Sequence, residues 1–242
     1  MELASRVALV TGGGRRVGQA LALALAGRGM HLAIHYNGSA EGARGTMDAA
    51  RKLGVNAELF QADLEDPEAA RRLPTEVARR FKRLDVLVNS AGIMTMATVE
   101  ETTPELWDQV MAVNLRSYFF TVQGALPWLR EAKGKVVNLA DVGGLEAWPR
   151  YTAHCVSKAG VVMLTRTLAL ALAPDITVNA IAPGAVLPPD DWDDAARQHL
   201  ARTTPLKRLG SAEDVAGALL YLLEADYVTG DTLVVDGGRL IR

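Results

Sequence analysis

A glycine-rich segment near the start of the chain has the residue types and spacing of a phosphate-binding turn. The run Val7–Val10 is short and apolar, as in a buried parallel strand, and residues 11–18 follow it with four glycines. Glycines let the chain reverse sharply and let backbone N–H groups approach a ligand that a Cβ would exclude. The helix predicted over 17–28 would aim the positive end of its dipole at the same point. The pattern predicts a nucleotide site, although an ordinary strand-to-helix turn has the same glycines.

The residues around this turn favour NADP(H) over NAD(H). Arg15 and Arg16 lie inside the turn and supply the positive charge that an additional phosphate requires. At the end of the second predicted strand, Asn37 and Ser39 stand where a carboxylate would hold the ribose 2′-OH of NAD, and the first acid is Glu41. A polar surface turn with two solvated arginines is the alternative interpretation.

Composition limits the classes of protein to consider. A chain of 242 residues that is 49% hydrophobic suits one large α/β domain or two small ones. The net charge of −2 gives no electrostatic footprint for nucleic acid, and the single Cys155 excludes an internal disulfide and fits a reducing compartment. We find no signal-peptide pattern and no apolar run near the ~20 residues that span a bilayer. We expect a soluble cytoplasmic protein with a small-molecule substrate and neither nucleic-acid nor membrane partners.

Strand and helix patterns alternate along the whole chain, which predicts an α/β fold with a doubly wound, parallel, seven-stranded sheet. Without a linker or an internal repeat, residues 1–242 are predicted to form one domain. The irregular stretch 183–205 follows the sixth strand and is predicted to be a substrate lid. The predicted strands are Val7–Val10, His31–Tyr36, Ala57–Gln61, Val86–Asn89, 136–139, 177–181 and Thr232–Val235, and the predicted helices are near 17–28, 41–53, 67–83, 104–130, 151–173 and 212–223.

Motifs in order along essentially the whole chain resemble the short-chain dehydrogenase/reductase family. They are the turn from Thr11 to Gly18, Ala62-Asp63-Leu64, Asn89-Ser90-Ala91-Gly92, Asn114, Lys158, the run 178–184 and the tail from Tyr227 to Gly238. The resemblance implies a single Rossmann domain with strand order 3-2-1-4-5-6-7. It also implies a homotetramer or a dimer, with the helices near 104–130 and 151–173 at the interface.

The resemblance also implies which residues bind NADP(H). Asp63 is expected to accept a hydrogen bond from the adenine amino group, and the small residues after the fourth strand would let the cofactor lie close. The full predicted set is Gly12, Gly14, Arg15, Arg16, Val17, Asn37, Ser39, Asp63, Leu64, Asn89, Ala91, Gly92, Lys158, Pro183, Gly184 and Val186.

Within the family, several details are similar to the pteridine reductase branch. Arg16 stands where most members have the middle glycine of the turn, and Asp141 stands where most have the catalytic serine. Two residues depart from that branch: His154 occupies the position of the catalytic tyrosine, and Met94 that of the aromatic residue that stacks on pterin. We expect Met94 and Trp192 to contact the substrate.

The family transfers a hydride from nicotinamide to a C=O or C=N carbon while a tyrosine supplies the proton. The resemblance assigns Lys158 to the nicotinamide ribose and Asn114 to a water that links Lys158 to solvent. His154 lies four residues before Lys158, so both side chains share a helix face. Because a protonated imidazole is a competent acid, with an ordinary pKa of ~6.5, we hypothesise that a coupled Asp141–His154 pair supplies the proton.

Three functions follow from the sequence. The first is an NADPH-dependent reductase of a dihydropterin, a dihydrofolate or a similar heterocycle, with Asn114, Asp141, His154 and Lys158 as catalytic residues. The second is an NADPH-dependent carbonyl reductase of the 3-oxoacyl type. The third is a catalytically weak NADP(H)-binding protein, because His154 replaces the family tyrosine. The remaining histidines do not cluster, so no metal is predicted.

Overall fold

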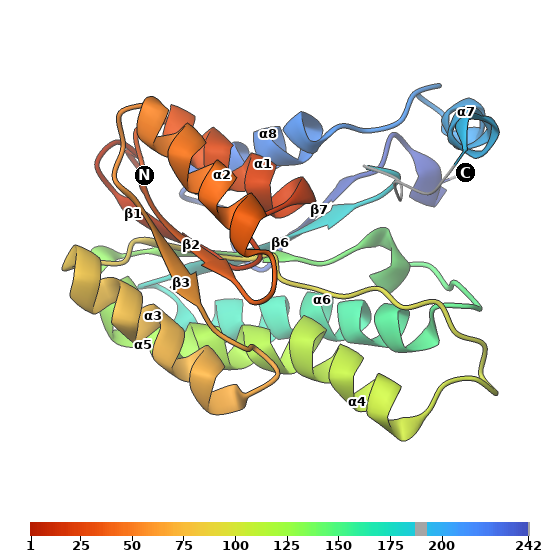
Figure 1. The fold of residues 1–242 in the computed structure, drawn as a ribbon, viewed down its shortest axis with the longest axis horizontal. Helices are drawn as coiled ribbons and strands as arrows, with labels where there is room; N and C mark the ends of the chain where they lie inside the picture. The colour runs from red at the N-terminus through yellow and green to blue at the C-terminus, as the bar shows by residue number, and fades with distance from the viewer. Residues whose placement is uncertain (187–192, 242) are drawn as a thin grey trace.

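The computed structural model describes residues 1–186 and 193–241, and its centre is one parallel sheet (Figure 1). The strand order is β3-β2-β1-β4-β5-β6-β7, which confirms the predicted Rossmann topology. Sequence patterns place five of the seven strands at their observed bounds. The strands are β1 Val7–Val10, β2 His31–Tyr36, β3 Ala57–Gln61, β4 Val86–Asn89, β5 Lys135–Leu139, β6 Thr177–Pro183 and β7 Thr232–Val235.

Helices cover both faces of the sheet, as right-handed crossovers between parallel strands require. One face carries α1, α2 and α8, and the other carries α3, α4, α5 and α6 (Figure 1). The helices are α1 Arg16–Gly27, α2 Ala40–Lys52, α3 Pro67–Phe81, α4 Pro104–Met111, α5 Ser117–Ala132, α6 Thr152–Leu172, α7 Asp194–Thr203 and α8 Ala212–Glu224.

Two apolar layers, one on each face of the sheet, form most of the core. In β1, Ala8 and Val10 pack into the layer beneath α1 and α8. Val7 and Leu9 pack into the layer beneath α3 and α5. Successive side chains of a strand point to opposite faces, so a strand covered on both faces must be apolar throughout. This explains why β1 reads as an unbroken apolar run.

The structure corrects two expectations about helices. The single helix predicted over 104–130 is interrupted by a π-helical turn, Ala112–Arg116, between α4 and α5. Such turns widen a helix locally and are frequent at functional sites, and this one carries Asn114. The stretch 183–205, predicted to be irregular, contains α7, and the Asp193 carboxylate caps it by accepting from the Ala196 N–H. Trp192, within the predicted lid, lies outside the described residues.

Helix α6 is long and apolar enough to cross a membrane by length and composition, contrary to the expectation from sequence. In the fold it packs against β5, β6 and the turn after β5. Its inward face buries Ser157, Lys158 and Thr165, and all three side chains are hydrogen-bonded within the protein. These features are typical of a core helix, which meets the same length and composition criteria.

Candidate active site

A cleft of about 630 Å³ lies at the carboxyl ends of β1, β2, β3 and β4. Parallel strands bring these ends to one edge of the sheet, which is where doubly wound folds bind ligands. Eleven of the predicted cofactor residues line the cleft: Gly12, Gly14, Arg15, Arg16, Val17, Asn37, Ser39, Asp63, Leu64, Ala91 and Gly92.

The turn between β1 and α1 requires glycine. Gly12 has a φ of +66°, and a Cβ there would lie 2.9 Å from the Cα of Ala91. A Cβ on Gly18 would lie 2.3 Å from the carbonyl oxygen of Gly12. The glycines therefore let the β1 turn, the start of α1 and the loop after β4 lie in contact.

The first turn of α1 is suited to an anion. The residue before the helix, Arg15, makes no side-chain cap, and the first turn contains no acidic residue. The backbone N–H groups at a helix N-terminus have no partner within the helix, and the helix dipole favours negative charge there. Arg15 and Arg16 are exposed beside this turn and add two positive charges.

The end of β2 lacks the carboxylate that NAD-specific sites use. Asn37 and Ser39 occupy this edge of the cleft, and the Asn37 amide donates to Asp63 over 3.4 Å. The Asp63 carboxylate also accepts from the Glu65 N–H over 3.0 Å. A ribose hydroxyl or a 2′-phosphate bound at this edge would therefore face the Asn37 amide and the Ser39 hydroxyl.

Several predicted cofactor residues lie outside this cleft. Asn89 is fully buried, and its side chain donates to Asn138 and accepts from Thr121. Asn89 therefore belongs to a hydrogen-bonded polar network in the core. Pro183 is buried at the end of β6, Gly184 packs on Asp236, and Val186 bridges to Gly210.

The sequence analysis missed His35, which lies beneath the glycine-rich turn. Its Nδ1 accepts the Gly12 N–H over 3.1 Å, and its Nε2 lies 3.1 Å from the Ala62 carbonyl oxygen, to which it donates. Burial lowers the pKa of His35 to about 4, although the Ala62 carbonyl and Asp63 act in the opposite direction. A neutral imidazole therefore joins the cofactor turn to the end of β3. The available signal was a histidine in the apolar interior of β2, directly before the strand's last residue.

Asn114 fixes the loop after β4 to helix α6. Its side-chain oxygen accepts the Ile93 N–H over 2.8 Å, while its Nδ2 donates to the Ile93 carbonyl over 2.9 Å and to Ser157 over 3.1 Å. A Cβ on Gly92 would lie 3.3 Å from the Asn114 oxygen, so this loop leaves little space for a side chain there. The π-helical turn thus anchors one wall of the cleft.

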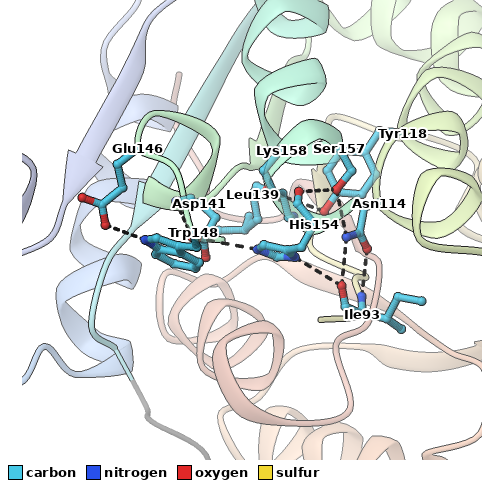
Figure 2. Close-up of polar contacts among 11 residues, drawn as sticks. Ile93, Asn114, Tyr118, Leu139, Asp141, Glu146, Trp148, His154, Ser157 and Lys158 are labelled. Carbon is cyan, nitrogen blue, oxygen red and sulfur yellow. Dashed lines mark hydrogen bonds and ion pairs between the residues drawn. The ribbon is translucent and has the colours of Figure 1, made fainter. Parts of the chain in front are cut away.

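His154 and Asp141, which the sequence analysis pairs as the proton source, lie close together but beyond hydrogen-bond distance. The His154 Nε2 is 3.9 Å from an Asp141 carboxylate oxygen, and its Nδ1 is 3.4 Å from the Ile93 carbonyl oxygen (Figure 2). Nε2 is buried and has no hydrogen-bond partner among the described residues. Both ring nitrogens therefore face oxygen acceptors, and only the doubly protonated ring offers a donor to each.

Lys158 and Trp148 complete the surroundings of His154. The Lys158 ammonium is buried and donates to the Leu139 carbonyl over 2.6 Å. Burial lowers the pKa of Lys158 to about 8, partly opposed by Asp141. The Trp148 ring is stacked parallel to the His154 ring, with planes 5° apart, and its Nε1 donates to Glu146. The predicted substrate residue Met94 is about half exposed on the loop after β4.

Comparison with known proteins identifies the family. A family model described as enoyl-(acyl carrier protein) reductase matches residues 13–239. A 3-oxoacyl-[acyl-carrier-protein] reductase from Staphylococcus aureus is 36% identical over 240 residues, covering 97% of this chain and 98% of the relative. The chain belongs to the short-chain dehydrogenase/reductase family. It is therefore an oxidoreductase of a family that uses NAD(P)H.

Two dehydrogenases are also similar to this chain over almost its whole length. The 3β-hydroxysteroid dehydrogenase 1 of Eggerthella lenta is 37% identical over 249 residues, covering 99% of this chain and 95% of the relative. The crystal structure of acetoin dehydrogenase from Salmonella typhimurium matches with a TM-score of 0.90 and 33% identity, covering 98% of this chain and 96% of that one. The family predicted from the motifs is confirmed, and these relatives span the whole chain.

The His35 contacts lead to a prediction about stability. Because the pKa of His35 is about 4 in the fold and ~6.5 in an unfolded chain, the unfolded state binds more protons between these values. The free energy of unfolding should therefore fall by up to about 3 kcal/mol as the pH drops from 6.5 to 4. Urea unfolding across this range should show a flatter pH dependence for His35→Asn than for the wild type. The exposed His199→Asn serves as the control and should keep the wild-type slope, and equal slopes for all three proteins would contradict the assignment.

Proposed function

We propose that this chain is an NADPH-dependent carbonyl reductase in which the Asp141–His154 pair supplies the proton. The observation that carries the proposal is the buried Nε2 of His154, which lies 3.9 Å from Asp141 and has no hydrogen-bond partner in the part of the chain that the structure describes. A buried polar atom without a partner is costly, so a substrate oxygen that accepts from Nε2 would satisfy it. Oxoacyl, hydroxysteroid and acetoin substrates named for the relatives all present a carbonyl or hydroxyl group.

The residues present fit NADP(H). The glycine-rich turn leaves no room for Cβ atoms, the start of α1 has neither an acid nor a side-chain cap, and Arg15 and Arg16 are exposed beside it. Lys158, with its buried ammonium, would hold the nicotinamide ribose. When bound, NADPH supplies the hydride that reduces the carbonyl carbon. Asn37 and Ser39, in place of a carboxylate, leave the end of β2 free of the negative charge that would repel a 2′-phosphate.

His154 can deliver the proton that balances this reduction. The Ile93 carbonyl accepts from Nδ1 and fixes the ring, while Asp141 stabilises positive charge on the imidazole. As the substrate carbonyl is reduced, the Nε2–H proton passes to its oxygen and leaves a neutral imidazole, which solvent reprotonates. The Lys158 ammonium stabilises the negative charge that develops on that oxygen. The Trp148 ring is stacked parallel to the His154 ring, whose side chain is buried.

Replacement of the proton donor tests the proposal directly. We expect His154→Ala to lower kcat about 10²–10⁴-fold, the usual contribution of a general acid, with little change in the Kd for NADPH. Asp141→Asn should also lower kcat, because the carboxylate charge that faces Nε2 of His154 is lost. NADPH oxidation would be followed by absorbance with a 3-oxoacyl thioester, a simple ketone and a dihydropterin.

Two controls separate loss of the proton donor from loss of folding. His154→Tyr restores the proton donor that the family uses, so it should retain much of the activity that His154→Ala loses. Thermal melting of each variant excludes loss of folding as the cause. An unchanged kcat in His154→Ala would contradict the assignment of His154. Turnover by His154→Tyr alone would instead favour the third function, a protein that binds NADP(H) and has lost the chemistry.

Asp141 favours one alternative substrate class. A carboxylate accepts hydrogen bonds, and one oxygen of Asp141 already accepts the Gly143 N–H, so the side chain suits a substrate with an N–H donor beside a C=N bond. A dihydropterin, the first expectation from sequence, has this pattern. Turnover of the dihydropterin without turnover of either carbonyl substrate would select this second function.

Cofactor choice gives an independent prediction. If Arg15 and Arg16 contact the 2′-phosphate, then Arg15→Gln with Arg16→Gln should raise the Kd for NADPH about tenfold or more, since hydrogen bonds to charged groups contribute about 1.5–3 kcal/mol. The Kd for NADH should change little, because NADH lacks that phosphate. Both constants can be measured by the fluorescence of the bound dihydronicotinamide. An equal loss of affinity for the two cofactors would show that the arginines contact a group common to both.

The outer faces of α5 and α6 support a homo-oligomer, and we propose a tetramer. Val156, Met163 and Leu170 recur every seven residues along α6 and are exposed, as is Phe119 on α5. An apolar stripe of this kind is typical of a helix that packs against another chain. Light scattering should give a mass near four times 25.9 kDa for the wild type and a lower mass for Met163→Glu with Leu170→Glu. A wild-type mass of one chain would contradict the proposal.

A further inference from the structure

The Lys158 ammonium is buried with little to compensate its positive charge. The described structure gives it one hydrogen bond, to the Leu139 carbonyl. Burial disfavours the charged form and lowers the pKa of Lys158 to about 8. The role of Lys158 in the proposed function, on which this inference rests, requires that the charge be kept near neutral pH.

A tyrosine outside the predicted site lies directly beside this ammonium. Tyr118, on α5, is fully buried, and the Lys158 Nζ lies over its ring, 5.4 Å from the ring centroid. An aromatic face carries negative charge density and attracts a cation within about 6 Å, most strongly where both groups are desolvated. Figure 2 shows Tyr118 and Lys158 reaching the same point from facing helices.

Hydrogen bonds hold the Tyr118 ring in this orientation. Its hydroxyl lies 3.0 Å from the Ala91 carbonyl oxygen and 3.3 Å from the Leu139 carbonyl oxygen, and it donates to them. These carbonyls follow β4 and end β5, so the ring is tied to the strand ends that form the cleft. The Leu139 carbonyl accepts from both Tyr118 and Lys158, which links the two side chains through one atom.

We propose that Tyr118 is a positioning residue that keeps the Lys158 ammonium charged and in place through the face of its ring. Among the described residues, the titratable groups around Lys158 are Asp141 from the turn after β5, His154 one helical turn earlier on α6, and Tyr118 from α5. The π-helical turn contributes the neutral Asn114. Asp141 favours the charge, a protonated His154 opposes it, and Tyr118 favours it without adding a formal charge of its own.

The test titrates Lys158 in the protein without cofactor or substrate. The ¹³Cε signal of Lys158, assigned by its absence in Lys158→Met, would be followed by NMR from pH 6 to 11. Tyr118 would be replaced by phenylalanine and by its mono-, di- and trifluorinated analogues, which weaken the ring face progressively at nearly constant volume. Because all members of this series lack the hydroxyl, they differ only in the charge distribution of the ring.

We expect Tyr118→Phe to titrate close to the wild type and each added fluorine to lower the titration midpoint. A total decrease of about one pH unit would be a tenfold change in the acid constant, or about 1.4 kcal/mol. Lys135 is the matched control, since it is equally buried but pairs with Asp226, and its titration should not change along the series. Tyr118→Leu, which removes the ring, should lower the midpoint at least as far.

A midpoint that is constant across the fluorinated series would overturn the proposal and leave Tyr118 as a core-filling residue. Thermal melting of each protein separates a lost fold from a lost interaction, and the fluorinated series remains informative if Tyr118→Leu does not fold. The measurement uses no substrate. Failure of the wild type to turn over any carbonyl would therefore contradict the proposed function but not the role of Tyr118.

Discussion

Parallel pairing of β1 with both β2 and β4 is the constraint on which the rest of this structure depends. It sets Val10 beside Ile34 and Val88, so the segments that follow these strands emerge at one edge of the sheet. Parallel strands in turn require crossover helices on both faces, and those helices bury the central strands β1 and β4 completely. The cleft, the glycine-rich turn and the loop that carries Ile93 are all consequences of this geometry.

The proposed catalytic side chains gather around two backbone oxygens, the Leu139 carbonyl at the end of β5 and the Ile93 carbonyl in the loop after β4. Ile93 accepts from Asn114 and lies within reach of His154, whereas Leu139 accepts from Lys158 and Tyr118. The Leu139 carbonyl belongs to β5 and the Ile93 backbone is held on both sides by the Asn114 side chain, so both oxygens have fixed positions for the side chains that bind them. A histidine can thus occupy the family's tyrosine position and still be oriented by the scaffold.

Local patterns in the sequence were sufficient for most of the fold. Alternating apolar strands and amphipathic helices, with glycine at the first turn, predicted the parallel sheet and most element bounds, because each depends on neighbours only a few residues apart. The strand order followed from the resemblance to the short-chain dehydrogenase/reductase family. The π-helical turn at Asn114 was not predictable in this way, since the residues around it suit an ordinary helix. Helix α7 was not predicted either. Prolines at both ends of the stretch 183–205 favoured an irregular conformation for all of it, although the residues of α7 itself contain no proline.

The sequence by itself determined the family, the parallel sheet and eleven of the residues that line the cleft. Motif spacing encodes these features directly. Only the tertiary structure decided that His35 supports the glycine-rich turn, that Asn89 belongs to a polar core network and that Tyr118 lies beneath Lys158. Each of these contacts joins elements far apart in the chain, and such contacts exist only once the strands have paired and the helices have packed on them.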